Sequence, residues 1–306
     1  MIKSFAINTN RRYLTVASGL WAIYALMSWF APQPPSSYHV SRLELGLVKL
    51  TVMLPILVIW LVAVYGAAHF KQYARLIRQS ADGRGLDLIS SGLLLVVASF
   101  ISQGLLGLLP NYFVGRKWLD LSVALGNTIP LAMSLIGFGL ILSGAMKLRT
   151  ITLRRLSAAG LAAILLPYCL LSVIYAWNFY QSVPLAAASG IPKFAGPGKM
   201  PFFTLAIPYI GMWLMGILAV TIIAEYARTV NGAVYRLALK DLVLGLSGVL
   251  GFSILLQLLQ LSAGLFAHMS IGGVLAVVYF ILILYAAGFV FIAKGARKLM
   301  LIEQHL

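Results

Sequence analysis

The chain has 306 residues, of which 61% are apolar and only 10% are charged. Soluble domains carry about 25% charged residues, so this composition excludes an ordinary soluble domain and indicates a membrane protein. The formal net charge is +16. Because the basic residues lie in short segments between apolar runs, they favour control of membrane topology over nucleic-acid binding. The single cysteine, Cys169, excludes an intrachain disulfide.

Eight apolar runs are long enough to cross a bilayer, which takes roughly 20 residues of helix. Lipid offers no partners for backbone N–H and C=O groups, so each run is expected to be an α-helix. In chain order the runs cover residues 13–30, 43–69, 87–109, 119–146, 156–178, 201–225, 241–266 and 271–293. The predicted fold class is therefore all-α, a polytopic membrane protein with eight transmembrane helices.

Several residues that stand out in an apolar chain recur in the same order in its two halves. The matches are Pro55 with Pro208, Trp60 with Trp213, and "YAR" at 73–75 with "YAR" at 226–228. Recurrence at a constant spacing indicates an internal duplication. We therefore expect two repeats of four helices, residues 1–150 and 151–306. Because each repeat has an even number of spans, the two should be parallel, related by a pseudo-two-fold axis along the membrane normal.

In a second set of matches, the spacing between matched residues is one residue longer than in the first. An insertion in a connecting turn would explain this difference. Asp87, Ser99 and Gln103 are matched by Asp241, Ser253 and Gln257. The two aspartates are expected to start the third and seventh spans, where a carboxylate suits the helix dipole. Asp82 and Gly83 are expected to help form the turn before the third span.

Most of the 23 Lys and Arg residues fall on the side of the predicted bundle that carries the N-terminus. By the positive-inside rule this asymmetry places both termini in the cytoplasm. The predicted localisation is the cell membrane, in a multi-pass arrangement with cytoplasmic N- and C-termini.

The polar residues deep inside the predicted spans are amides and hydroxyls rather than charges. They are Ser99, Gln103, Asn127, Ser253, Gln257 and Gln260. One interpretation is a polar pocket near the axis between the repeats. The other is hydrogen bonding between helices that only holds the bundle together. Asn127 with Pro130 also marks a possible break in the fourth span.

The recurring "YAR" segments fall in equivalent turns of the two repeats. Tyr73, Arg75, Tyr226 and Arg228 are therefore a candidate docking surface for a cytoplasmic partner.

No catalytic residues, metal ligands or cofactor are predicted, because the sequence has neither an HExxH nor a GxSxG motif. The leading hypothesis is a non-enzymatic multi-pass membrane protein that acts as a helical scaffold or as a subunit of a membrane assembly. The alternative is a transporter or channel for a neutral or apolar small molecule with its site between the repeats. The expected partners are the lipid bilayer and other membrane subunits or a second copy of the chain, without nucleic acid.

Overall fold

The computed structural model describes residues 2–31, 42–77, 79–113, 118–148, 202–261 and 271–303, and within these ranges the regular structure is entirely α-helical. The helices are α1 (Ile2–Phe30), α2 (Arg42–Leu76), α3 (Ala81–Leu106), α4 (Leu109–Tyr112), α5 (Leu119–Leu148), α7 (Phe202–Thr229), α8 (Ala233–Leu261) and α10 (Ile271–Glu303). Seven helical segments are long and apolar enough to cross a membrane. The expected span at 156–178 lies outside the described residues.

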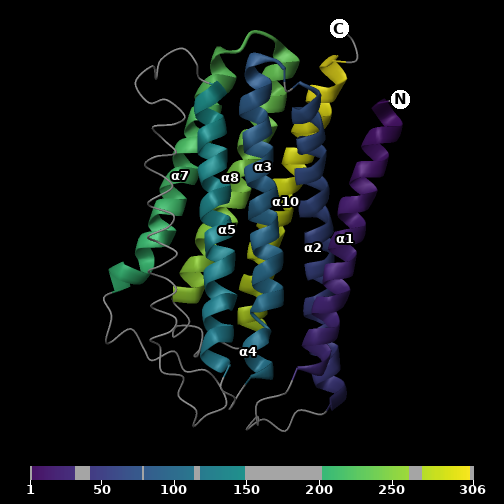
Figure 1. The fold of residues 1–306 in the computed structure, drawn as a ribbon, viewed down its shortest axis with the longest axis vertical. Helices are drawn as coiled ribbons and strands as arrows, with labels where there is room; N and C mark the ends of the chain where they lie inside the picture. Colours follow the sequence, from purple (N-terminus) through teal and green to yellow (C-terminus); the bar gives the residue numbers. More distant parts are fainter. Residues whose placement is uncertain are drawn as a thin grey trace.

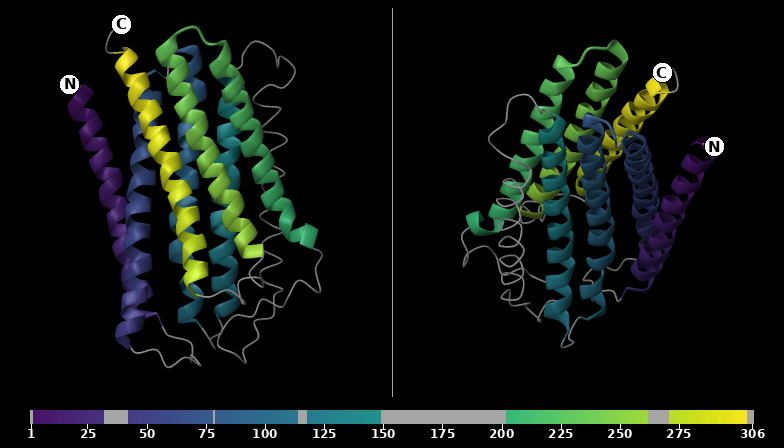
Figure 2. Two further views of the ribbon diagram at one scale, coloured as in Figure 1. Left: turned by 180° about the vertical axis from the view of Figure 1, so that it is seen from behind. Right: turned by 45° about the horizontal axis from the view of Figure 1, so that its top comes forward.

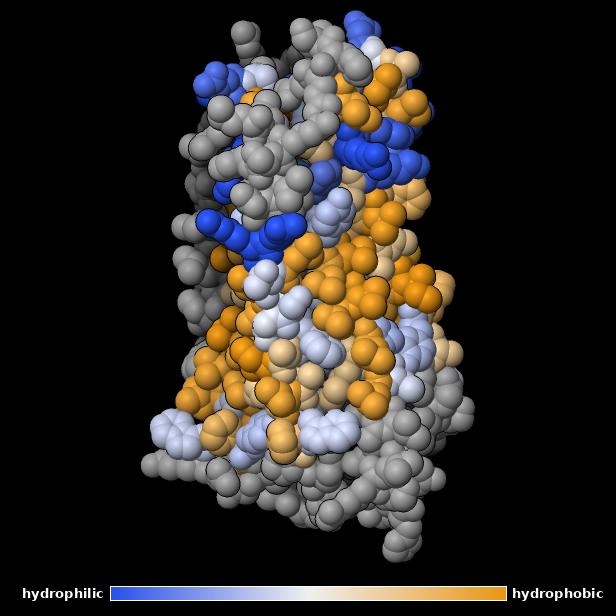
Figure 3. Space-filling view, turned by 90° about the vertical axis from the view of Figure 1, so that its right-hand side faces the viewer, coloured by the Kyte–Doolittle hydropathy of each residue, from blue (hydrophilic) through white to orange (hydrophobic). Residues whose placement is uncertain are grey.

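The long helices run side by side along one axis of the molecule, with α1 at one edge (Figures 1 and 2). The start of α1 and the end of α10 lie at the same end of this bundle, which we call the terminal end (Figure 1). Figure 3 shows the most hydrophilic residues toward the terminal end and a band of hydrophobic residues across the middle. An apolar middle with a basic end is the surface expected of a multi-pass membrane protein.

Most helices are longer at the terminal end than the hydropathy of the sequence predicts. Apolar character ends where charged residues begin, but Lys, Arg and Gln are good helix formers, so the helices continue through them. The turn between α2 and α3 is confined to residues 77–80, where the Ser80 hydroxyl accepts a hydrogen bond from the backbone N–H of Gly83. The prediction that Asp82 and Gly83 form this turn is wrong, because both belong to the first turn of α3.

The prediction for the two matched aspartates is also wrong. Asp87 and Asp241 lie beyond the first turns of α3 and α8 instead of starting them. They are too far from the helix ends to benefit from the N-terminal dipole. Other groups must therefore balance their charge.

Two pairs of antiparallel helices approach closely through small residues. A Cβ atom added at Gly137 of α5 would lie 2.9 Å from the carbonyl oxygen of Gly92 in α3. At the crossing of α8 and α10, a Cβ atom added at Gly288 would lie 2.8 Å from the carbonyl oxygen of Gly245. Backbones this close leave no room for a side chain, so glycine is required there for packing.

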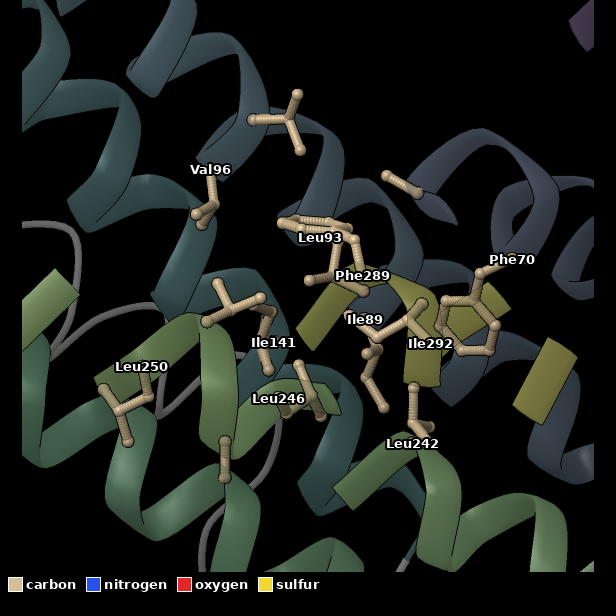
Figure 4. Packing of buried hydrophobic residues seen from close by; sticks show 14 of the residues in the cluster. Phe70, Ile89, Leu93, Val96, Ile141, Leu242, Leu246, Leu250, Phe289 and Ile292 are labelled. Carbon is tan, nitrogen blue, oxygen red and sulfur yellow. The ribbon is translucent and has the colours of Figure 1, made fainter. Parts of the chain in front are cut away.

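One continuous core joins all the described helices except the short α4. Figure 4 shows side chains of α2, α3, α5, α8 and α10 that contribute to it, among them Phe70, Leu93, Ile141, Leu246 and Phe289. Since residues from both ends of the chain share this core, the described helices form a single packed body.

Proline interrupts the hydrogen bonding of α2 at Pro55. Proline has no N–H, so the carbonyl of Thr51, four residues earlier, lacks its helical donor. The Tyr279 hydroxyl of α10 donates to that carbonyl oxygen at 2.6 Å. A side chain from a distant helix therefore compensates for the proline, as packed neighbours in a membrane bundle do.

Candidate functional site

A cavity of about 50 Å³ lies between α3, α5, α7, α8 and α10. It is lined by Val96, Ser99, Phe100, Gln103, Gly126, Asn127, Pro130, Leu131, Ser134, Tyr209, Phe252, Ser253, Leu256 and Tyr285. None of these lining residues is charged, although amide and hydroxyl groups are frequent among them. A buried water needs roughly 10–15 Å³ of such space, so the cavity has room for about three or four waters or for a small organic molecule.

The cavity brings together four of the six polar residues singled out in the sequence. Ser99 and Gln103 reach it from α3, Asn127 from α5 and Ser253 from α8. Gln257 and Gln260 belong to α8, but their side chains lie outside the described residues. Polar residues far apart in the chain thus share one small volume.

Ser99 is buried and takes part in hydrogen bonding between helices. Its hydroxyl donates to the carbonyl oxygen of Pro130 at 2.6 Å, and the Ser134 hydroxyl lies 2.6 Å from the Ser99 Oγ atom. α5 runs unbroken past Pro130, so the expected break at Asn127 and Pro130 is absent from this helix. Pro130 still leaves the carbonyl of Gly126 without its helical donor, and Gly126 also lines the cavity. Through its own hydrogen bonds, Ser99 contributes to the packing of α3 against α5.

Gln103 differs from Ser99 in its hydrogen bonding. No hydrogen bond joins its side-chain amide to another of the residues that the structure describes. An amide offers one acceptor and two donors, so Gln103 brings unused hydrogen-bonding capacity to the cavity wall.

Tyr285 is the least expected residue of the site. Its side chain is fully buried, and its hydroxyl has no hydrogen-bond partner within the described part of the chain. A buried hydroxyl without a partner gives up its hydrogen bonds to water and gains none in return. Sequence reasoning missed Tyr285 because it is one of two tyrosines in a long apolar run of α10 that has no other polar motif. A hydroxyl in the middle of that run was the one signal available.

The Tyr285 ring is held in place by other aromatic rings. Its centroid lies 4.1 Å from that of Phe252, 4.9 Å from that of Phe100 and 4.9 Å from that of Phe289. These contacts fix the ring within a packed layer, so the hydroxyl cannot move away to find a partner elsewhere.

The four residues of the candidate docking surface separate into two kinds. Arg75 and Arg228 are exposed at the terminal end. Tyr73 is buried, and the Tyr226 hydroxyl donates to the Oδ2 atom of Asp82 at 2.5 Å. Tyr73 therefore faces into the bundle and the half-buried Tyr226 is bound to Asp82, whereas the two arginines are exposed.

Asp82 links three helices at the terminal end. Its Oδ2 atom accepts hydrogen bonds from Tyr226 of α7 and, at 3.3 Å, from the Tyr235 hydroxyl of α8. Hydrogen bonds to a carboxylate are stronger than those between neutral groups. Sequence reasoning missed this cluster because its members are separated by more than 140 positions.

Ion pairs at the terminal end balance the charges of Asp87 and Asp241. The Nζ atom of Lys71 lies 2.6 Å from Oδ1 of Asp87 and also donates to the Ser91 hydroxyl at 2.5 Å. Asp241 is paired with Lys298 at 2.6 Å. Asp87 is thus bound to α2, whereas Asp241 is bound to α10. The two matched aspartates therefore have different surroundings.

Comparisons of the chain with protein-family models, with curated proteins and with solved structures find no match. The site must therefore be interpreted from its own chemistry.

Proposed function

We propose that this chain binds a small neutral molecule in the cavity between its helices and transfers it across the membrane. The observation that supports this most directly is the grouping of Gln103, Asn127, Ser253 and Tyr285 around one uncharged cavity in an otherwise apolar bundle. Polar groups are unfavourable inside a membrane and often mark the path of a substrate. A lining without charge suits a neutral molecule better than an ion.

The proposal includes a duplicated architecture, with halves at 1–150 and 151–306 and eight spans in all. Support comes from the close helix crossings. Gly92 with Gly137 and Gly85 with Gly144 join α3 to α5, just as Gly245 with Gly288 and Ala238 with Gly295 join α8 to α10. The α3 and α8 positions, Gly92 with Gly245 and Gly85 with Ala238, keep the spacing of the Pro55 and Pro208 match, whereas the α5 and α10 positions are two residues closer together.

The match between the two aspartates does not keep this spacing. Asp87 and Asp241 are one residue further apart than Gly92 and Gly245. One residue corresponds to about 100° of rotation around a helix. The same shift separates Gln103 from Gln257. In the proposed duplication the glutamines therefore need not occupy equivalent positions.

In this proposal the terminal end faces the cytoplasm of a cell membrane. The basic residues of the described helices support that orientation, since they are concentrated there. Examples are Arg75, Arg84, Arg228, Arg236 and Arg297.

A second candidate function is that of a subunit or scaffold in a membrane assembly, including one made of copies of this chain. The observation that favours it concerns α1, which lies at the edge of the bundle with little of its surface covered (Figure 2). Val16, Ile23, Leu26 and Phe30 are exposed apolar side chains on this helix. They would face lipid or another membrane protein.

Flux into liposomes tests the proposed transfer. Purified protein is reconstituted, and the entry of a panel of neutral solutes is followed by light scattering after rapid mixing. We expect faster entry of at least one solute than into protein-free liposomes, and a return toward the protein-free rate for Gln103→Leu. Thr221→Val is the control, because the Thr221 hydroxyl bonds only within its own helix on an exposed surface. Wild-type rates equal to protein-free rates for every solute would overturn the proposal.

A further inference from the structure

Resting on the proposed function, we infer that the cavity takes a small planar amide, and that the Tyr285 hydroxyl donates a hydrogen bond to its carbonyl oxygen. Tyr285 is fully buried, lines the cavity and has no hydrogen-bond partner among the described residues. Buried hydroxyls are normally satisfied by protein, water or ligand. Because no described residue supplies a partner for this hydroxyl, we assign that role to the cavity's occupant.

Gln103 indicates which functional groups the occupant of the cavity carries. Its side-chain amide lines the same cavity and makes no hydrogen bond to the described residues around it. An amide pairs best with a group that offers both a carbonyl and N–H donors. A second amide has both in one plane, whereas an ether or a ketone has only acceptors.

The walls of the cavity favour a flat molecule. Phe100, Phe252 and Tyr285 form adjoining rings, with the Phe100 and Phe252 centroids 5.1 Å apart. A planar group can lie against such rings while its edge carries the hydrogen bonds. The volume of about 50 Å³ suits a ligand of the size of urea or acetamide.

The absence of charge excludes the charged relatives of these molecules. None of the described residues that line the cavity is a carboxylate, a lysine or an arginine. An acetate or an ammonium ion would lose its hydration there without gaining a counter-charge. Acetamide should therefore be preferred over acetate, although the two have nearly the same shape.

The test uses two readouts on the full chain in liposomes or nanodiscs. The first is the flux of acetamide and urea, with glycerol and acetate as comparison solutes. The second is the NMR resonance of the Tyr285 ring in protein labelled at tyrosine Cζ, assigned by its disappearance in Tyr285→Phe. Tyr279→Phe is the matched control, since it removes a hydroxyl that bonds to the Thr51 carbonyl instead of lining the cavity.

We expect acetamide to shift the Tyr285 resonance and acetate to leave it unchanged. Tyr285→Phe should weaken apparent acetamide affinity about tenfold, the effect of losing one hydrogen bond. Tyr279→Phe should keep the wild-type affinity.

The two readouts separate failure of this inference from failure of the proposed function. Acetamide flux that is the same in wild type and Tyr285→Phe, with no shift of the resonance, would overturn the role of Tyr285 and leave transfer intact. A shifted resonance without flux of any solute would support the amide site and overturn transfer. If neither flux of any solute nor a shift of the resonance is observed, both the transfer and the amide site are overturned. Ordered water would then be the cavity's occupant.

Discussion

The terminal end and the cavity both place polar side chains inside an apolar bundle, but they satisfy these groups differently. At the terminal end, Asp82, Asp87 and Asp241 each have a partner on another helix. In the cavity, the amide of Gln103 and the hydroxyl of Tyr285 have none among the described residues. Paired groups hold helices together, whereas groups without partners are available to a ligand. In the proposed function, the first region holds the helices together and the second binds a ligand.

The largest effect should follow from breaking the buried ion pair at the terminal end. Lys71→Met leaves the carboxylate of Asp87 without its cation, and the two side chains are only 11% and 19% exposed. Removing one partner of a buried pair destabilises a protein by about 3 kcal/mol or more. Reversible unfolding in mixed micelles measures this loss.

The double variant Lys71→Met with Asp87→Leu is the control for that measurement. It removes both charges, so most of the lost stability should return. A double variant as unstable as Lys71→Met alone would mean that packing, and not charge pairing, matters at this position.

A smaller effect is expected where Asp82 joins the helices. Tyr226→Phe removes one of the two hydrogen bonds that reach the Asp82 carboxylate, the shorter one at 2.5 Å. Because Tyr226 is only half-buried, we expect a loss near the lower limit for bonds to charged groups, about 1.5 kcal/mol. The same unfolding assay applies, with the exposed Tyr65 changed to Phe as the control. Equal stability of the two variants would mean that the Asp82 cluster does not hold α3 to α7.

Ser99 lines the cavity but is hydrogen-bonded to another helix. It therefore tests whether its hydrogen bond or its position in the cavity determines its contribution to stability. Ser99→Ala removes the hydrogen bond to the Pro130 carbonyl. Polar contacts between membrane helices are worth about 0.6 kcal/mol on average, and we expect a loss of that size. Ser90→Ala is the control, since the buried Ser90 hydroxyl donates to the Asp87 carbonyl within the same helix. No difference between the two variants would show that the interhelical bond of Ser99 adds nothing.

The contrast between the two regions also explains what the sequence could predict. The spans were recognisable because lipid forces long apolar runs into helices, and the seven that fall in the described residues are all helical. Ser99, Gln103, Asn127 and Ser253 were recognisable because each is a polar group that membrane burial disfavours. Their common cavity depends on how the helices pack, which the positions of these residues along the chain do not specify.

The terminal end was less predictable for a physical reason. Hydropathy registers the loss of apolar character at Lys71 and Arg84, but the helices continue beyond it on their own hydrogen bonds. Whether Asp87 faces Lys71 depends on the length of the turn at 77–80 and on helix rotation. Pairings of this kind are set by three-dimensional geometry, which residue types alone do not specify.

Tyr285 should give the smallest effect on stability, and this result would sharpen the contrast most. Tyr285→Phe keeps the ring against Phe252 and removes a hydroxyl that has no partner in the described bundle. Removing an unsatisfied buried group is close to neutral or slightly stabilising, so we expect a change within about 0.5 kcal/mol. The expected change in stability is opposite in sign to that for Tyr226→Phe, although each substitution removes a tyrosine hydroxyl. A loss above about 1 kcal/mol would mean that the hydroxyl already has a partner such as ordered water. The cavity would then be a stabilising polar network like the terminal end.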